Sequence, residues 1–376
     1  MKRSRILTAT ATAALVLAPL AACGPPSKNG SSDKTSSGVK VSEAKSAADF
    51  GGMDGLVKAA KKEGKLNVIA LPPDWSNYGN IIKAFQAKYG ITITSAQPDA
   101  ASQDEINAAT QQKGKSTAPD VFDVGQSVAL ANTQMFAPYQ VATFGDIPAQ
   151  YKDPNGTWVN DYGGYMSIGY DSKKVPAVTK VDDLLKPDYK GKVALNGDPT
   201  QAGSAFSGVV MVALSQGGSA DNVGPGVDFF KKLKQAGNFL PVDPTSATIE
   251  SGQTPVVIDW DYLNAAETKK LPTWKVVVPP GNPVAGYYFQ AINKDAPHPA
   301  AARLWEEFLY SDAGQNLWLA GGARPVRADA MVKAGTIDKT AYDALPKVTG
   351  TPVIVTDAQS KKATAYLTSN WAKAVG

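Results

Sequence analysis

Cysteine and histidine are almost missing from this chain of 376 residues, which has one of each, Cys23 and His298. A single cysteine excludes an internal disulfide, and a single histidine leaves little for a transition-metal site or a Ser/His catalytic triad. His298 directly precedes Pro299 and is interpreted as a helix-entry residue. The Gly-x-Ser-x-Gly motif of nucleophile-elbow hydrolases is also missing. We therefore expect no enzyme activity, no metal site and no cofactor.

Long apolar runs and an excess of charge are lacking as well. Beyond the amino-terminal residues, no segment approaches the roughly 20 apolar residues that a membrane-spanning helix needs. The formal net charge is +4, from 38 basic and 34 acidic residues. Lys2, Arg3 and Arg5 lie at the amino terminus, so the remainder carries 38 − 3 = 35 basic residues against 34 acidic ones, about +1. A nucleic-acid partner, which requires a clustered basic face, is not expected.

The first 23 residues have the pattern of a lipoprotein leader. After the basic start, residues 11–20 form a short apolar run that is closed by Leu-Ala-Ala-Cys at 20–23. This run is too short to span a bilayer stably. It resembles the lipobox of bacterial lipoproteins, which implies that residues 1–22 are removed and that Cys23 is lipidated. Because two acyl chains suffice for stable anchoring, we expect the protein on the outer face of the cell membrane. An ordinary cleaved signal peptide is the alternative.

Helix and strand patterns alternate from residue 54 onward, after a tether at residues 23–45 that is rich in Gly, Ser, Pro and Lys. Ser102 and Glu105 are expected to form a capping box. The order predicts an α/β fold with two lobes, each a mostly parallel sheet flanked by helices. The first lobe is expected at residues 46–168 plus 291–376, and the second at 169–290. Expected strands are 66–70, 91–94, 121–124, 192–195, 255–258 and 275–278, and expected helices begin near 54, 81, 102, 205, 227, 299 and 313.

Aromatic, carboxylate and amide side chains recur directly after the predicted strands. Ligands of open α/β sheets bind at the carboxyl ends of strands, so these residues are candidates for a cleft between the two lobes. Each segment alone is also explained by packing or turn formation. The candidates are Asp74, Trp75 and Tyr78 after the first strand, Gln126 and Ser127 after the third, and Asp259, Trp260, Asp261 and Tyr262 in the second block.

Several strings in this order resemble a known family, the two-lobed solute-binding lipoproteins of ABC importers. They are LVKAAKKEGKL at 56–66, IGYDSKKVP at 168–176, KPDYKGKVA at 186–194, HPAAA at 298–302 and GARPVR at 322–327. The group includes polyamine-, ferric-ion-, thiamine- and phosphonate-binding members. The resemblance implies a periplasmic-binding-protein-like fold of type II, whose lobes close on a small solute. It also implies delivery to a membrane permease with its ATPase, and we expect the receptor to act as a monomer.

The candidate residues are consistent with two classes of ligand. Trp75, Tyr78 and Trp260 resemble the aromatic positions of the polyamine-binding members, and nearby carboxylates suit an ammonium group. However, Tyr262 stands where those members place a carboxylate. The ferric-binding members use two adjacent tyrosines in this segment, and only Tyr262 is present; Tyr287 and Tyr288 are adjacent but lie on a predicted strand, where alternation separates them.

A second pattern points to an anion. Gly203, Ser204 and Ala205 open a helix after a strand and loop, and a helix start attracts anions; simple capping by Ser204 is the alternative. An amine-bearing, polyamine-like solute is therefore the first hypothesis. An anionic or zwitterionic, phosphonate-like solute, or ferric ion with an anion, is the alternative. A secreted hydrolase that uses Asp259 and Asp261 as paired carboxylates is less favoured.

Overall fold

The computed structural model describes residues 34–346 and 348–376. The predicted leader and Cys23 lie outside the described residues, as do residues 23–33 of the predicted tether. The last residues of that tether are packed on the protein: Ala44 is fully buried, and the Arg303 guanidinium donates hydrogen bonds to the carbonyls of Ser42 and Ala44 at 2.7 and 2.8 Å. Structure therefore begins before residue 46.

The first lobe starts as the sequence predicts. Helix α1 (Met53–Glu63) ends at Gly64, whose φ of 69° is the left-handed conformation that favours glycine. Strand β1 (Lys65–Ile69) pairs in parallel with β2 (Thr92–Ala96), and α2 (Tyr78–Tyr89) lies between them in sequence. Helix α3 (Ser102–Gln111) then leads to β3 (Val121–Val124).

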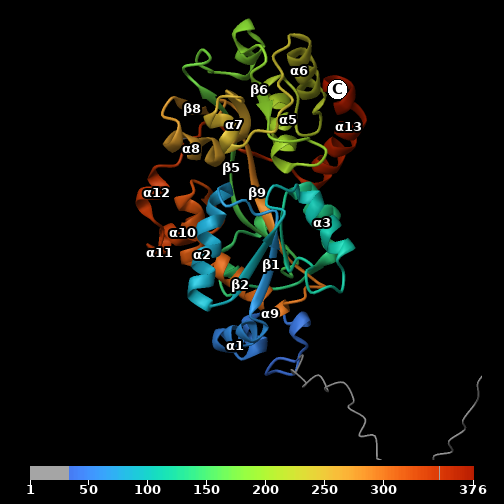
Figure 1. The fold of residues 1–376 in the computed structure, drawn as a ribbon, viewed down its shortest axis with the longest axis vertical. Coiled ribbons are helices and arrows are strands. Elements are labelled where there is room, and N and C mark those ends of the chain that lie inside the picture. Colours follow the sequence, from blue (N-terminus) through green and yellow to red (C-terminus); the bar gives the residue numbers. More distant parts are fainter. Residues whose placement is uncertain (1–33, 347) are drawn as a thin grey trace, which may run out of the picture. The chain divides into compact units, whose positions relative to one another are not determined.

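Two long strands connect the lobes. The sequence analysis did not identify the first, and of the second it placed only Tyr287 and Tyr288 on a strand. Strand β5 (Val159–Asp171) is antiparallel to β9 (Val284–Asn293). Strand β9 also pairs with β3, whereas the far half of β5 pairs with strands of the second lobe. Figure 1 shows β5 and β9 running from the part that contains β1 and β2 to the part that contains β6 and α5.

The second lobe is built on β6 (Val193–Leu195), β7 (Val256–Trp260) and β8 (Trp274–Val277). Strand β6 is parallel to β7, but β7 and β8 are both antiparallel to β5. The sheets are therefore mixed rather than mostly parallel, because each strand that connects the lobes enters a sheet against the direction of its neighbours. The helices here are α5 (Gly203–Ser215), α6 (Gly224–Gln235), α7 (Ser246–Glu250) and α8 (Asp261–Lys270).

The carboxyl-terminal part lies against both lobes. Strand β11 (Val353–Ile354) extends β9 in parallel. Helix α13 (Asp357–Val375), expected with the first lobe, packs on α6 of the second lobe, where the rings of Trp371 and Phe230 lie 5.1 Å apart. The remaining elements are α4 (Gln126–Ala131), β4 (Phe136–Ala137), α9 (Pro299–Leu309), α10 (Asp312–Ala320), β10 (Arg324–Pro325), α11 (Ala328–Ala334) and α12 (Lys339–Asp343).

Short 3-10 helices complete the described chain. They are η1 (Val41–Glu43), η2 (Ala47–Phe50), η3 (Trp75–Asn77), η4 (Thr133–Met135), η5 (Phe144–Asp146), η6 (Ala149–Tyr151), η7 (Val181–Leu185) and η8 (Pro187–Tyr189). None of the described helices is both long and apolar enough to cross a bilayer.

Candidate functional site

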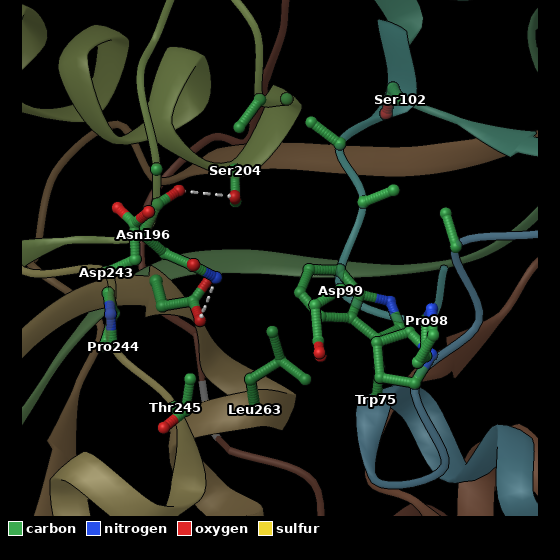
Figure 2. A pocket seen from close by; sticks show the side chains of 18 of the residues that line it. Trp75, Pro98, Asp99, Ser102, Asn196, Ser204, Asp243, Pro244, Thr245 and Leu263 are labelled. Atoms are coloured by element: carbon green, nitrogen blue, oxygen red, sulfur yellow. Dashed lines mark hydrogen bonds between the residues drawn. The ribbon is translucent and has the colours of Figure 1, made fainter. Parts of the chain in front are cut away.

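A cavity of about 530 Å³ lies between residues of the two lobes. The first lobe contributes the segment after β1 and the segment between β2 and α3. The second lobe contributes the loop from β6 to α5, the start of α7, the end of β7 and one face of α8. Figure 2 shows Trp75, Pro98 and Asp99 on one side of the cavity and Asn196, Asp243 and Thr245 on the other. A ligand of drug-like size fits such a volume.

The lining is strongly acidic. Among the described residues that line the cavity there is no Lys, Arg or His. Both lobes supply carboxylates, so acidic groups face the cavity from either side. The acidic lining residues are Asp74, Asp99, Glu105, Asp123, Asp198, Asp243, Asp259 and Glu267. The electrostatic potential in a cleft lined by one sign of charge favours ligands of the opposite sign.

A chain of hydrogen bonds joins an indole to a carboxylate at the wall of the cavity. Trp75 follows β1, and its Nε1–H donates to the hydroxyl of Tyr162 at 2.7 Å. The Tyr162 hydroxyl in turn donates to Oδ2 of Asp123 at 2.9 Å. Tyr162 lies on β5 and is fully buried. The indole is thereby fixed in orientation beside the cavity by a residue of a strand that connects the lobes.

Asp123 and Glu105 are buried acids on the side of the first lobe. Asp123 is only 7% exposed and Glu105 1%. Burial raises the pKa of Asp123 to about 7, although the hydroxyls of Tyr78 and Tyr162 favour its charged form. Burial and the neighbouring Asp123 charge raise the pKa of Glu105 well above its usual range. Low local dielectric therefore favours the neutral form of both groups when no cation is near.

Asp259 is the corresponding acid on the side of the second lobe. It lies in β7, 6% exposed. Its carboxylate accepts the Asn196 side-chain amide at 2.8 Å and the backbone N–H of Trp260 at 2.8 Å. Burial raises the pKa of Asp259 to about 7 despite these two donors. Each lobe thus presents at least one buried, hydrogen-bonded carboxyl group to the same cavity.

Tyr288 is the second aromatic residue of the cavity lining. Its ring lies 5.6 Å from that of Trp75 at an angle of 77°, and it stacks on Tyr162 at 5.5 Å. Tyr287 lies in the neighbouring position of β9 and contacts Tyr151 at 4.7 Å instead. The alternation predicted for these two tyrosines is confirmed, and Tyr288 is the one that reaches the large cavity.

The start of α5 also borders the cavity through Gly203 and Ser204. Ser204 does not cap the helix: the N-cap residue is Ala202, without a side-chain hydrogen bond. The Ser204 hydroxyl instead donates to the carbonyl of Asn196 at 2.9 Å (Figure 2). The first-turn amides of α5 are therefore not satisfied by a side-chain cap, as an anion site at a helix start requires.

The structure brings together some of the predicted site residues and separates others. Asp74, Trp75, Gly203, Ser204 and Asp259 line the large cavity. Gln126, Ser127 and Trp260 line a neighbouring void of about 30 Å³, which Gly203 and Tyr288 also border. Tyr78, Ala205, Asp261 and Tyr262 line neither and are buried.

The buried candidates have structural contacts of their own. The Tyr78 hydroxyl accepts from Gln290 at 2.9 Å. Asp261 accepts the backbone N–H of Tyr165 at 2.9 Å, and Gln126 donates to the carbonyl of Val355 at 2.6 Å. The segment 259–262, expected as a loop, is the end of β7 and the start of α8. This explains why Asp261 and Tyr262 point into packed structure.

Two buried lining residues were not found from the sequence, Glu105 and Asp123. The predicted capping box at Ser102 is wrong, since Asp104 accepts the backbone N–H of the N-cap residue. Ser102 and Glu105 instead accept the backbone N–H groups of Gly125 and Asp123. One feature of the sequence could have pointed to Asp123. It is an aspartate within the apolar strand 121–124, where burial of an unpaired acid costs free energy.

The model of the family of bacterial extracellular solute-binding proteins matches residues 117–349. The chain belongs to this family. Its members are solute-binding proteins rather than enzymes, which confirms the prediction that this chain is not an enzyme.

Single relatives and solved structures agree with this assignment. The Fe(3+)-binding periplasmic protein of Serratia marcescens is 25% identical over 149 residues, and the match covers 37% of this chain and 42% of that protein, so the chain spans less than half of the length of this relative. A periplasmic thiamin-binding protein has a TM-score of 0.65 at 18% identity, with 83% of this chain and 96% of that chain covered. The ferric binding protein of Campylobacter jejuni has a TM-score of 0.61 at 16% identity, with 82% and 99% covered. At these identities the two structures establish the fold, and the predicted two-lobed type II architecture is confirmed.

Proposed function

We propose that this protein is the solute-binding receptor of an ABC import system and captures a small organic cation, of the polyamine-like class, between its lobes. The observation that carries this proposal is the composition of the cavity lining, with eight carboxyl groups and no basic side chain among the described residues. Such a lining repels an anionic solute, and it offers a neutral one hydrogen bonds but no attraction between opposite charges. An ammonium group neutralises it and gains a desolvated contact with an aromatic face, worth about 1–2 kcal/mol.

The acids of the two lobes explain how the solute would drive closure. A ligand shifts a conformational equilibrium only by its differential contacts with the two states. An ammonium between Asp123 and Asp259 contacts the first lobe through one carboxylate and the second lobe through the other. Both contacts exist together only when the lobes are close, so the cation favours the closed form that docks on the permease.

A zwitterion is the second candidate, because the start of α5 offers uncapped backbone amides at the same cavity. A solute with an ammonium at one end and a carboxylate or phosphonate at the other would use both features. Ferric ion has less support. Among residues 34–346 and 348–376 no group of three or more His, Cys, Asp or Glu side chains is placed to hold a metal ion. Of the adjacent tyrosines Tyr287 and Tyr288, only Tyr288 lines the cavity.

The further assignments remain part of the proposal. We place the ligand contacts on Asp74, Trp75, Gly203, Ser204 and Asp259, with closure over them by lobes at residues 46–168 plus 291–376 and 169–290. Lipidation of Cys23 would hold the monomeric receptor at the outer face of the membrane beside its permease and ATPase.

A thermal-shift screen followed by calorimetry tests the proposal. The unlipidated full chain, made with Cys23→Ser, is incubated with putrescine, spermidine, 2-aminoethylphosphonate, Fe³⁺ with citrate, and glucose. We expect the amines to raise the melting temperature and to bind one molecule per chain, with glucose inert. Stabilisation by 2-aminoethylphosphonate alone would favour the zwitterion. Stabilisation by Fe³⁺ with citrate and by no amine would refute the cation hypothesis.

A further inference from the structure

We propose that Asp123 is the anchoring carboxylate for the ammonium group of the solute, and that binding releases one proton from Asp123 and its buried neighbour Asp161. This inference deepens the proposed function and rests on it. Neither residue was a candidate from the sequence.

The Asp123 carboxyl group has a buried oxygen that could accept a hydrogen bond but has no donor. Asp123 lines the cavity although its side chain is more than nine-tenths buried. Oδ2 accepts the Tyr162 hydroxyl at 2.9 Å, whereas Oδ1 has no partner within hydrogen-bond distance; the nearby Tyr78 hydroxyl favours the charged form without reaching that distance. A buried acceptor that is left unpaired costs about 1–3 kcal/mol. A donor from a bound solute removes that cost, so the empty cavity already contains one half of the contact.

The groups around Asp123 contain no positive charge to balance it. None of the ion pairs in the described part of the chain includes Asp123, Asp161, Glu105 or Asp259. The titratable groups that interact with Asp123 come from six elements and are all acids or phenols: Tyr78 of α2, Glu105 of α3, Asp161 and Tyr162 of β5, Tyr262 of α8, Tyr288 of β9, and Tyr310 after α9.

The empty cavity therefore favours protonated carboxyl groups. Burial raises the pKa of Asp123 to about 7. Burial, together with the nearby Asp123 charge, raises the pKa of Asp161 well above its usual range. Asp161 Oδ2, like Asp123 Oδ1, has no hydrogen-bond partner. Two such neighbours cannot both ionise cheaply, so near neutral pH the pair retains at least one proton.

Binding of a cation reverses this preference. The ammonium group donates a hydrogen bond to Asp123 Oδ1 and supplies the missing positive charge. The carboxyl proton passes to solvent, so a neutral acid and a free ammonium become an ion pair and a hydrated proton. No bond of the solute is broken and no other reactant is needed. The cavity thereby exchanges a proton for a cation.

The exchange is measured by titration calorimetry of the unlipidated full chain with putrescine at pH 6, in buffers of different ionisation enthalpy. The dependence of the observed heat on the buffer gives the number of protons released. We expect about one proton per chain from Asp123 and Asp161 at pH 6, up to one more from Asp259, and none at pH 9. For each proton released, the affinity is expected to rise by up to tenfold per pH unit below pH 7 and to level off above it.

Asp123→Asn is the decisive variant, with Asp99→Asn as its control, because Asp99 is an exposed acid of the same cavity. Asparagine retains an oxygen for the Tyr162 hydroxyl, and circular dichroism verifies the fold. We expect Asp123→Asn to lower proton release by about one proton per chain and to weaken binding by about 30-fold or more. Asp99→Asn should keep proton release and lose only a few-fold in affinity.

Two results would overturn the inference. One is putrescine binding by the unmodified cavity without proton release. The other is unchanged proton release in Asp123→Asn. Either outcome leaves the proposed function standing, since the amine still binds. If no amine binds at all, the proposed function fails and this inference fails with it.

Discussion

Removal of the Trp75 side chain tests the aromatic wall of the cavity. Trp75→Ala deletes the ring that lies beside the cavity and the hydrogen bond of 2.7 Å to Tyr162. A desolvated cation–π contact is worth about 1–2 kcal/mol, and the lost hydrogen bond, which helps to fix Tyr162 and Asp123, about 1 kcal/mol. The sum of about 2–3 kcal/mol corresponds to a loss of about 30- to 150-fold in affinity for an amine.

Trp75→Phe separates the two contributions. Phenylalanine keeps an aromatic face but has no N–H to donate, so we expect a loss of only about fivefold, the equivalent of about 1 kcal/mol. Titration calorimetry with putrescine at pH 8, where proton release is small, measures both variants.

Trp158→Ala is the matched control. Trp158 is also partly buried, but its ring packs at a tilt of 43° against that of Phe289, with the ring centroids 4.7 Å apart, and it does not line the cavity. Its removal should lower stability and leave the dissociation constant unchanged. The reasoning is refuted if Trp75→Ala binds as tightly as the original chain, or if Trp158→Ala weakens binding as much.

Three further predictions concern stability. Without ligand, the melting temperature should fall between pH 5 and pH 8, and the double variant of Asp123→Asn and Asp259→Asn should flatten this profile; a rise with pH contradicts the buried-acid argument. Trp371→Ala should cost about 3–5 kcal/mol in urea unfolding by emptying the space beside α6, whereas Tyr366→Ala, which is 40% exposed, should cost under about 1 kcal/mol. Arg303→Met should leave buried carbonyls without donors and speed proteolysis before residue 46; an unchanged cleavage rate would show that the segment is held by other contacts.

The sign of the pH effect follows from the two acids. The pKa of Asp123 and of Asp259 is raised from 3.8 to about 7 in the folded chain. Between these values the folded state binds more protons than the unfolded state, so the free energy of unfolding falls as pH rises. The slope is about 1.4 kcal/mol per pH unit for each fully protonated group. A saturating cation should reduce the slope, because it stabilises the ionised forms.

The sequence predicted the local elements better than their connections. The strand 121–124 and the end of α1 at Gly64 were placed correctly because apolar runs and a terminal glycine are local signals. Strand β5 was missed, and of β9 only the part with Tyr287 and Tyr288 was placed on a strand. Their glycines and tyrosines, such as Gly163, Gly164 and Tyr165, give no alternation of apolar and polar residues.

The residues of the site were also predicted only in part, because the sequence signals are local. Trp75 and Asp259 lie at the ends of strands, where a rule about strand ends finds them. Asp123 and Glu105 lie in segments that read as an apolar strand and a helix start, and only tertiary packing reveals that both face the cavity. Asp261 and Tyr262 fit the same rule, but their side chains are buried in packed structure because α8 begins at Asp261.

A close backbone contact beside the cavity connects the chemistry to the geometry of the lobes. A Cβ on Gly125, just after β3, would lie 3.1 Å from the Cα of Gly203, the first residue of α5. The backbones of the two lobes are therefore in close contact near the point where Asp123 and the amides of α5 border the cavity. On the proposed function, the acids that border the empty cavity retain their protons. A bound cation takes the place of those protons while it contacts both lobes, so the exchange of charge and closure of the lobes become a single event.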